Sequence, residues 1–458
     1  MSRVSGFFVR VFEYAVPDPY IFAVGLTLVT AVLAFIFAPH HTLGAVLASW
    51  YGGIVGKDNI FQFALQMILI LVTGYALANS KPVARVLEWL AQIPRSTKDA
   101  VSLTFLVSAI ACWLNWGFGL VVAGLLAREI ARRMRIDFGW LVAAAYSGFL
   151  IWASGWSSSI ALAQSTPGSK LNIVQSVTGQ VLPIQSMILP WFNLAPVIAL
   201  LIILPLVFRA LEPSDVVMGD VAALDGSSEK TCHPEPVEGR PSLSRPNRNT
   251  LAHALENAWL LNLIFAIAGL GYIASTWLYT GFALDINSLI LIFFCLGLLL
   301  HRTPIAYVGA VNDAARITGP LIIQYPIYGG IMGIMTATGL AGVIAQWFDT
   351  FATGATLPFW SYVSSIIISL FVPSGGGHWA VQGPFAVPAA VRLHASLPAT
   401  AMGVAIGEEV ANMIQPFWAL PVLAIAGVGL RRVMAFTVVS FVIAFVVFGL
   451  SLLFLIPR

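Results

Sequence analysis

The sequence predicts an all-α polytopic membrane protein, built as an inverted repeat with two re-entrant hairpins and two broken transmembrane helices. Three observations carry this prediction. Charged residues make up only 9% of the 458-residue chain and hydrophobic residues 59%, whereas soluble domains have about 25% charged residues. Two long apolar segments are each divided by a run of glycine and polar residues into arms too short to cross a bilayer. The two halves of the chain also present similar segments in the same order.

Composition also excludes several classes of protein. The net charge of +3 comes from lysines and arginines in loops between apolar segments, so it does not indicate a nucleic-acid partner. The three cysteines, at positions 112, 232 and 295, lack the spacing of a disulfide framework or a metal site. We therefore expect a lipid bilayer as the surroundings, with no nucleic acid, no metal site and no cofactor.

The first predicted repeat covers residues 1–210 and begins with a basic amphipathic helix at 2–14, which does not resemble a cleavable signal. Apolar stretches of about 20 residues predict membrane spans, because that length crosses the hydrocarbon core. Charged residues and bulky apolar residues that alternate at helical spacing predict an interfacial helix. These patterns give spans at 20–38, 61–79 and 189–208, a weaker interfacial stretch at 43–56, and an interfacial helix at 83–93.

The first predicted hairpin covers residues 99–134, where Asn115-Trp116-Gly117-Phe118-Gly119 divides two apolar arms. Both outer ends of this segment are basic, and basic loops stay in the cytoplasm. We therefore expect a re-entrant hairpin that opens to the cytoplasm. The next segment, 138–163, is expected to cross the membrane as a broken span, because a serine- and glycine-rich run at 154–159 interrupts its middle.

A predicted cytoplasmic linker, residues 211–252, separates the halves and contains a low-complexity insertion at 224–250 that we expect to be disordered. The second predicted repeat covers residues 253–458. Its segments are spans at 259–279, 286–300 and 321–348, an amphipathic stretch at 302–318, a hairpin opening to the outside at 357–394, a broken span at 398–428 and a last span at 433–456.

A shift of 258 residues superposes the two halves. It places Gln66 on Gln324 and Gly117 on Gly375, and it brings the two hairpins and the two broken spans onto each other. Counting crossings from a cytoplasmic N-terminus gives the two copies opposite orientations. Inverted repeats of this kind are typical of secondary transporters, whose sites lie near the midplane between discontinuous helices.

Candidate site residues gather at the hairpin tips and the broken spans. Polar groups are costly in hydrocarbon, so they face a protein interior or a watery cavity. Glycines at a tip let successive backbone N–H groups converge on an anion, and a helix that starts there adds its positive end. The alternative reading is close helix packing through small residues. The predicted substrate-binding residues are Asn115, Trp116, Gly117, Gly119, Ser157, Ser374, Gly375, Gly376, Gly377, His378, Asn412 and Gln415.

Glu408 is the candidate ion-coupling residue. It shares one helical face with Asn412 and Gln415, at spacings i, i+4 and i+7. Pro416 lacks an N–H, so it frees the carbonyl of Asn412 for a cation or a water. Glu409 points to another face and is interpreted as a boundary residue, and a buried structural carboxyl remains the alternative for Glu408.

Several long motifs resemble the bacterial short-chain fatty acid transporter family, whose best-known members carry acetoacetate and butyrate. The resemblance covers almost the whole chain outside residues 224–250. It implies the fold of the ion-transporter superfamily: a homodimer in the inner membrane, with a scaffold domain and a hairpin-bearing transport domain. The family pattern includes the first glutamate of the 408–409 pair. The motifs are Pro17-Asp-Pro, Asn115-Trp-Gly-Phe-Gly-Leu-Val-Val, Arg128-Glu, Gly148-Phe-Leu, Val372-Pro-Ser-Gly-Gly-Gly-His-Trp, Gln382-Gly-Pro-Phe and Gln415-Pro-Phe-Trp-Ala-Leu-Pro.

The resulting expectation is a secondary carrier of short-chain monocarboxylates coupled to H+ or Na+, and not an enzyme. The carboxylate is expected at the hairpin tips, and the alkyl tail against Trp116, Phe118, Trp379 or Phe417. Two alternatives stay open. One is a dicarboxylate or amino-acid carrier of the same superfamily. The other is a membrane-embedded hydrolase using Ser374 and His378, although no third orienting carboxylate is evident.

Overall fold

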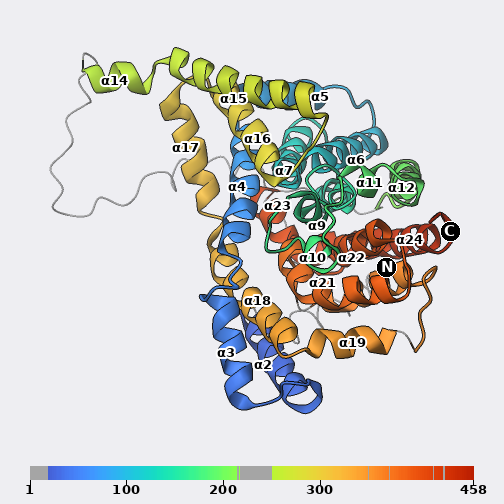
Figure 1. The fold of residues 1–458 in the computed structure, drawn as a ribbon. Helices are drawn as coiled ribbons and strands as arrows, with labels where there is room; N and C mark the ends of the chain where they lie inside the picture. Colours follow the sequence, from blue (N-terminus) through green and yellow to red (C-terminus); the bar gives the residue numbers. More distant parts are fainter. Residues whose placement is uncertain are drawn as a thin grey trace, which may run out of the picture.

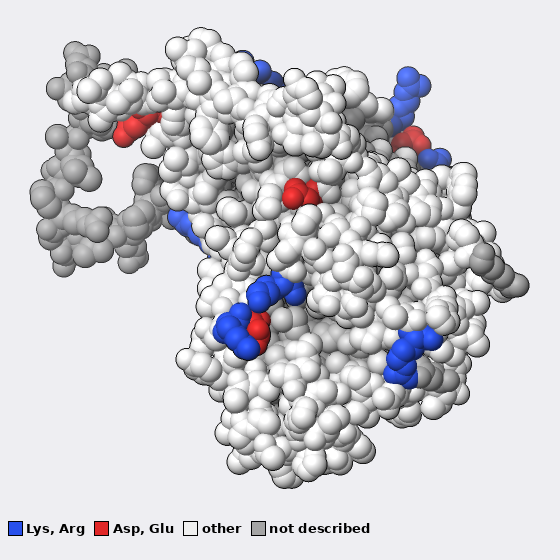
Figure 2. Space-filling model, viewed as in Figure 1, with Lys and Arg blue, Asp and Glu red and all other residues white. Residues whose placement is uncertain are grey.

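We analysed a computed structural model, which describes residues 19–213, 216, 250–348, 350–370, 372–415, 417–426 and 429–457. Within these ranges every regular element is a helix (Figure 1). The expected helix at 2–14, nearly all of the insertion at 224–250, and Pro416 lie outside the described residues. Figure 2 shows a surface on which charged side chains form only a few small groups, as expected for a protein surrounded by lipid.

The first half contains the hairpin α6–α7 and the broken span that follows it. Its elements are α2 (Pro19–Phe37), α3 (Leu43–Ile54), α4 (Phe61–Ala78), α5 (Lys81–Leu90), α6 (Thr97–Leu114), α7 (Trp116–Ala131), α8 (Phe138–Ser147), the 3-10 helix η1 (Gly148–Ile151), α9 (Ser159–Ser165), α10 (Ile173–Thr178), α11 (Gln185–Ile188) and α12 (Trp191–Ala210).

The second half contains the hairpin α20–α21 and its own broken span, α22–α23. Its elements are α14 (Leu251–Glu256), α15 (Trp259–Thr280), α16 (Ile286–His301), α17 (Pro304–Ala315), α18 (Gly319–Ala337), α19 (Leu340–Phe348), α20 (Leu357–Ser369), α21 (Gly375–Arg392), α22 (Leu397–Ala411), α23 (Ala419–Ala426) and α24 (Leu430–Phe454).

Five helices in the described ranges are long and apolar enough to cross a membrane: α4, α6, α12, α15 and α24. The expectation that both arms of the first hairpin are too short to cross is therefore wrong for α6, which has 18 residues. The segment at 321–348, expected to be one glycine-interrupted span, is instead two helices, α18 and α19, bent by 76°. The bend follows from Gly339, whose φ of +83° ends one helix before the next begins at Leu340. This makes α19 the counterpart of α5 rather than the end of a straight span.

The two halves repeat the same order of helices. α4 begins at Phe61 and α18 at Gly319, a displacement of 258 residues. The pairs α5 and α19, α6 and α20, α7 and α21, and α8 and α22 begin within two residues of the same displacement. Packing follows the same scheme, because α4 contacts α7 as α18 contacts α21, and α6 contacts α8 as α20 contacts α22. The fold class predicted from the sequence is confirmed.

The halves also exchange their outer helices. α2 and α3, from the first half, pack on α18, whereas α16 and α17, from the second half, pack on α4. In Figure 1 the first group lies at the lower end of the molecule and the second at the upper end. The sequence indicated only a weak interfacial stretch for α3, but Gly53 brings its backbone directly onto α18, because a Cβ at this position would overlap the backbone carbonyl of Gly329.

Loops that the charge count places on one side of the membrane meet one another. On the predicted cytoplasmic side, Arg209 Nη1 lies 2.8 Å from Asp99 Oδ1. On the predicted outer side, Gln185 Nε2 donates a hydrogen bond of 3.0 Å to the carbonyl of Phe282. The arrangement is therefore consistent with the predicted topology, in which hairpins approach the interior from opposite ends.

Candidate functional site

The tip of the first hairpin is tied to the first broken span. Asn115 separates α6 from α7 and caps α7, since its Oδ1 accepts a 2.9 Å hydrogen bond from the N–H of Phe118. The N–H of Trp116 donates a 2.8 Å hydrogen bond to Ser157 Oγ, in the break between η1 and α9. Ser157 thus positions the tip, and two of the first N–H groups of α7 are already satisfied within the protein.

The tip of the second hairpin presents an uncapped helix terminus. Ser374 is the N-cap of α21, but its side chain makes no capping hydrogen bond. Its Oγ instead donates to Tyr325 Oη at 3.2 Å, and Trp418 Nε1 donates to the carbonyl of Pro373 at 2.8 Å. The first N–H groups of a helix have no partner within the helix and carry its positive end. This positive end points into a buried region, because Ser374 and Gly375 are buried.

The tip glycines allow close packing as well as backbone approach. A Cβ on Gly376 would overlap the ring of Phe63, and one on Gly377 would overlap the ring of Tyr328. A Cβ on Gly117 would lie 2.9 Å from Leu71 Cα. The alternative interpretation, close helix packing through small residues, therefore describes Gly117, Gly376 and Gly377. Gly375 differs, because a Cβ there would lie 2.6 Å from the ring of Trp152, a residue that lines the same cavity as Gly375.

Both hairpin tips and both breaks meet at one closed cavity. Its volume is about 10 Å³, which is enough for about one water molecule. A short-chain organic ion does not fit into that volume, so binding one there requires the walls to separate. The lining residues are Trp116, Phe149, Trp152, Ser159, Leu321, Tyr325, Ser374, Gly375 and Trp418.

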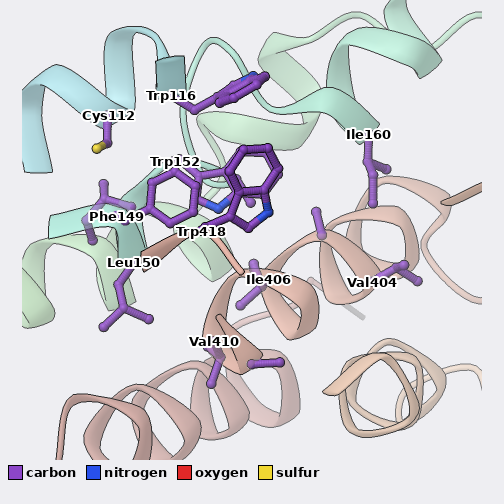
Figure 3. Close-up of a cluster of buried hydrophobic side chains, with 14 of the residues drawn as sticks. Cys112, Trp116, Phe149, Leu150, Trp152, Ile160, Val404, Ile406, Val410 and Trp418 are labelled. Carbon is purple, nitrogen blue, oxygen red and sulfur yellow. The ribbon is translucent and has the colours of Figure 1, made fainter. Parts of the chain in front are cut away.

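Aromatic residues make up much of the cavity lining, and Figure 3 shows the side chains of Trp116, Phe149, Trp152 and Trp418 in the surrounding hydrophobic cluster. The ring of Phe149 stacks on Trp152 with centroids 5.6 Å apart, and it lies 6.2 Å from Trp418. Trp116 meets Trp418 edge to face at 5.3 Å. Rings in such contact provide a rigid apolar surface, so these walls suit a short alkyl group.

Two hydrogen-bond donors at the cavity have no acceptor. The indole Nε1 atoms of Trp116 and Trp152 are buried and make no hydrogen bond among the described residues. An indole N–H can only donate, and buried polar groups almost always find a partner. Among the described residues that line the cavity there is no lysine, arginine, aspartate or glutamate. The cavity therefore combines unpaired donors, hydroxyl groups and a helix N-terminus with apolar walls, which matches one carboxylate on a short apolar chain.

The predicted polar face of α22 forms a hydrogen-bonded chain. Asn412 Nδ2 donates to Glu408 Oε1 at 3.3 Å, and Gln415 Nε2 donates to Asn412 Oδ1 at 2.7 Å. The spacing of these residues in the sequence is thus confirmed as a shared face. Glu408 is fully buried, and its Oε2 atom has no hydrogen-bond partner in the described part of the chain.

The interpretation of Glu409 as a boundary residue is wrong. Glu409 is fully buried, and its Oε2 accepts hydrogen bonds from the backbone N–H groups of Ala153 and, at 3.2 Å, Ser154. These two N–H groups lie in the break of the first broken span, where no helical carbonyl accepts them. The Glu409 carboxyl group therefore links the broken spans of the two halves.

The Asn412 carbonyl is not an open ligand either. The hydroxyl of Tyr146, on α8, donates to it at 2.9 Å. This carbonyl was expected to serve a cation or a water, but a side chain of the first half already occupies one of its lone pairs. The contact gives a second link between the broken spans.

His378 supports the second hairpin from inside. Its Nε2 lies 2.6 Å from Gln382 Oε1 and 3.0 Å from Ser365 Oγ, and Ser365 Oγ donates to the carbonyl of Val404 at 2.6 Å. Gln382 Oε1 and Ser365 Oγ can both accept a hydrogen bond from an Nε2 proton, so residues of α20 and α21 hold the ring. Ser374 bonds to Tyr325 rather than to His378, so the serine–histidine pair required by the hydrolase alternative is not formed.

The structure thus brings Trp116, Ser374 and Gly375 to the cavity, and places the other predicted residues in the layer behind it. Phe118, Trp379 and Phe417, expected to hold an alkyl tail, are not lining residues. Sequence reasoning missed six lining residues, which are Phe149, Trp152, Ser159, Leu321, Tyr325 and Trp418. Three of them lie within motifs already singled out: Phe149 in Gly148-Phe-Leu, Ser159 in the run at 154–159, and Trp418 in Gln415-Pro-Phe-Trp. These motifs were therefore the available signal.

Comparisons with known proteins identify the family of this chain. The family model described as "Short chain fatty acid transporter" matches residues 1–455. A relative from Escherichia coli (strain K12) is 39% identical over 457 residues, covering 99% of both chains. A relative from Haemophilus influenzae is 36% identical over 459 residues, covering 99% of this chain and 100% of that protein. Both are named "Putative short-chain fatty acid transporter".

Two solved structures share the fold. The YdaH transporter of Alcanivorax borkumensis superposes with a TM-score of 0.57 at 16% identity, covering 95% of this chain and 98% of that one. MtrF of Neisseria gonorrhoeae, described as one of a class of antimetabolite efflux pumps, superposes with a TM-score of 0.51 at 14% identity, covering 98% and 97%. At these identities the likeness concerns the fold alone.

Proposed function

Because this chain belongs to the short-chain fatty acid transporter family, we propose that it carries monocarboxylates such as butyrate and acetoacetate by binding them in the cavity between the hairpin tips. It is a transporter and not an enzyme. We also propose secondary active transport in the bacterial inner membrane, by a homodimer whose N-termini are cytoplasmic, as the family resemblance and the loop charges imply.

The unpaired indole N–H groups of Trp116 and Trp152 carry the proposal. A carboxylate between them supplies the missing acceptor, and hydrogen bonds to a charged group are the strong ones. The uncapped N-terminus of α21 at Gly375 adds backbone donors and a positive potential. The alkyl chain then lies against Phe149 and Trp418, where burial of each CH₂ contributes about 0.8 kcal/mol.

The same lining residues favour a monocarboxylate over the alternative cargoes. A second carboxylate in the cavity would have no lysine or arginine to pair with, and desolvating an unpaired charge is costly. An amino group would likewise find no aspartate or glutamate there. The dicarboxylate and amino-acid carriers of the superfamily are therefore the weaker candidates.

Coupling through Glu408 completes the proposal. Its carboxyl group is buried in the layer behind the cavity and keeps one oxygen without a partner. A carboxyl group in such a place can take up and release one H+ as the cavity changes its exposure. Na+ is the alternative coupling ion, with carboxyl and hydroxyl oxygens of the same layer as ligands.

Uptake of labelled butyrate into proteoliposomes tests the proposal. We expect propionate and acetoacetate to compete with butyrate. Succinate should compete poorly because its second charge finds no partner in the cavity, and butyramide should compete poorly because it has no carboxylate. Imposed H+ and Na+ gradients identify the coupling ion. Competition by succinate as strong as that by propionate would contradict the proposed site.

A further inference from the structure

A second cavity, remote from the hairpin tips, lies where α5 and α17 begin. Its volume is about 700 Å³, and its walls come from the ends of α4 and α16 and the first turns of α5 and α17. This volume is in the range of sites that hold small molecules. The proposed transport function makes no use of it.

The walls of this cavity carry unpaired positive charge. Lys81, Arg85 and Arg302 line it, and among the described lining residues only Asp313 is acidic. In the described part of the chain, none of the three basic side chains forms a hydrogen bond or an ion pair within the protein. The cavity therefore holds a net charge of about +2, and its cations are available to an anion.

Two helix N-termini add to this potential. α5 begins at Lys81 and α17 at Pro304, and the side chains of their N-caps, Ser80 and Thr303, make no capping hydrogen bonds. Lys81 and Thr303 line the cavity, so both termini open toward it. Helix N-termini favour anions, and phosphate oxygens in particular.

A mainly apolar cavity adjoins the basic one. It has a volume of about 520 Å³ and shares Arg302 and Thr303 with the basic cavity. Its other lining residues are Trp259, Leu263, Leu298 and Leu299, together with Asn257 and Asn262. Arg302 thus stands at a boundary between a basic compartment and an apolar one. A free phosphate ion would use only the first compartment, whereas a molecule with a charged head and a hydrocarbon tail would fill both.

The surrounding surface is typical of a membrane interface. Val86 and Trp89 on α5 are 52% and 61% exposed, and Ile305 and Val308 on α17 are 46% and 50% exposed. Tryptophan beside basic residues is characteristic of the headgroup level of a bilayer. The charge count places the loops at Lys81 and Arg302 on the cytoplasmic side, and their meeting at one cavity agrees with that placement.

We propose that this cavity binds the phosphate headgroup of an anionic phospholipid, with one acyl chain in the adjoining apolar cavity. Lys81, Arg85 and Arg302 contact the phosphate together with the N-termini of α5 and α17. Basic pockets between transmembrane helices recognise anionic headgroups in this way. The site joins α4 and α5 of the first half to α16 and α17 of the second.

Native mass spectrometry of the purified full-length protein tests the site. The probes are phosphatidylglycerol and phosphatidylcholine, and the variant is Lys81→Gln/Arg85→Gln/Arg302→Gln. A matched control, Lys57→Gln/Arg95→Gln/Arg135→Gln, removes the same charges from exposed residues outside the cavity. Each basic residue near an anionic headgroup strengthens binding by roughly fivefold. We expect the variant to lose about 100-fold in phosphatidylglycerol affinity, and the control to bind like the wild type.

Two further measurements keep the outcome decisive. The single variant Arg85→Gln should weaken binding about fivefold, which covers the case in which the triple variant does not fold. Inorganic phosphate at 100-fold excess should not displace the lipid. Three results would overturn the proposal. The first is that the cavity variant binds phosphatidylglycerol as tightly as the control variant does. The second is that the wild type binds phosphatidylcholine as tightly as phosphatidylglycerol, and the third is that inorganic phosphate displaces the lipid.

Discussion

Removing the indole N–H groups of the tip cavity, through Trp116→Phe and Trp152→Phe, tests how the carboxylate is held. Phenylalanine keeps an aromatic ring in the wall but has no donor. A hydrogen bond to a charged group contributes about 1.5–3 kcal/mol, and about 1.4 kcal/mol corresponds to a tenfold change in affinity. Each variant should therefore bind butyrate roughly 10- to 150-fold more weakly.

The assay is titration of the purified variants with butyrate and with hexanoate, followed by uptake in proteoliposomes. Loss of a donor should weaken both acids by the same factor, whereas a packing defect should be relieved by the longer chain, which fills the vacated space. Trp113→Phe is the control, because Trp113 packs on Trp156 with ring centroids 5.7 Å apart and is not a lining residue. Unchanged affinity in both cavity variants, or recovery with hexanoate, would refute the reasoning.

Three other predictions follow from the contacts around the cavity. Glu408→Gln should retain butyrate counterflow and lose accumulation driven by a pH gradient, because it mimics a permanently protonated carboxyl; accumulation equal to the wild type would make Glu408 structural. Gly376→Val should abolish uptake, since its side chain would overlap the Phe63 ring, and Phe63→Ala should restore part of it in the double variant; undiminished uptake by the single variant would contradict this. Asp137→Asn should lower the free energy of unfolding by about 1–3 kcal/mol. The asparagine keeps the cap of α8 but loses the ion pair between the fully buried carboxylate and the partly exposed Arg432. Thermal unfolding in detergent measures this loss, and an unchanged melting temperature would count against a stabilising ion pair.

The hairpins and the broken spans were predictable because each leaves a local mark in the sequence. Asn115 separates α6 from α7, and Ser374 is the N-cap of α21 after the interruption that follows α20. Lipid does not tolerate unpaired backbone groups, so glycine and polar residues in the middle of apolar segments indicate structure that is buried in protein. The same constraint explains why the two halves could be aligned by their interruptions.

The cavity wall was not predictable from the same signals. Phe149 and Trp152 come from η1 and its C-cap, whereas Tyr325 comes from α18, and only the packing of these two elements brings them together. An aromatic residue in an apolar segment has no local feature that separates a wall from a core. Of the tip glycines, the sequence could not show which pack against rings and which face the cavity.

Glu409 shows a different limit. Helical periodicity assigned it to another face than Glu408, which is correct, and that face was taken as peripheral. In a helix buried on all sides there is no peripheral face, and Glu409 meets the N–H groups of Ala153 and Ser154 in the other half. Periodicity gives the direction of a side chain but not the neighbour that it meets.

The central claim is that the transported carboxylate binds between the two hairpin tips. A crystal structure with 4-bromobutyrate tests it most directly, because anomalous scattering locates the bromine and the density locates the carboxylate. The account predicts the carboxylate within hydrogen-bonding distance of the indole nitrogens of Trp116 and Trp152, near the N-terminus of α21, and the bromine against Phe149 and Trp418. A single bromobutyrate bound elsewhere, with these two indole N–H groups still unpaired, would contradict it.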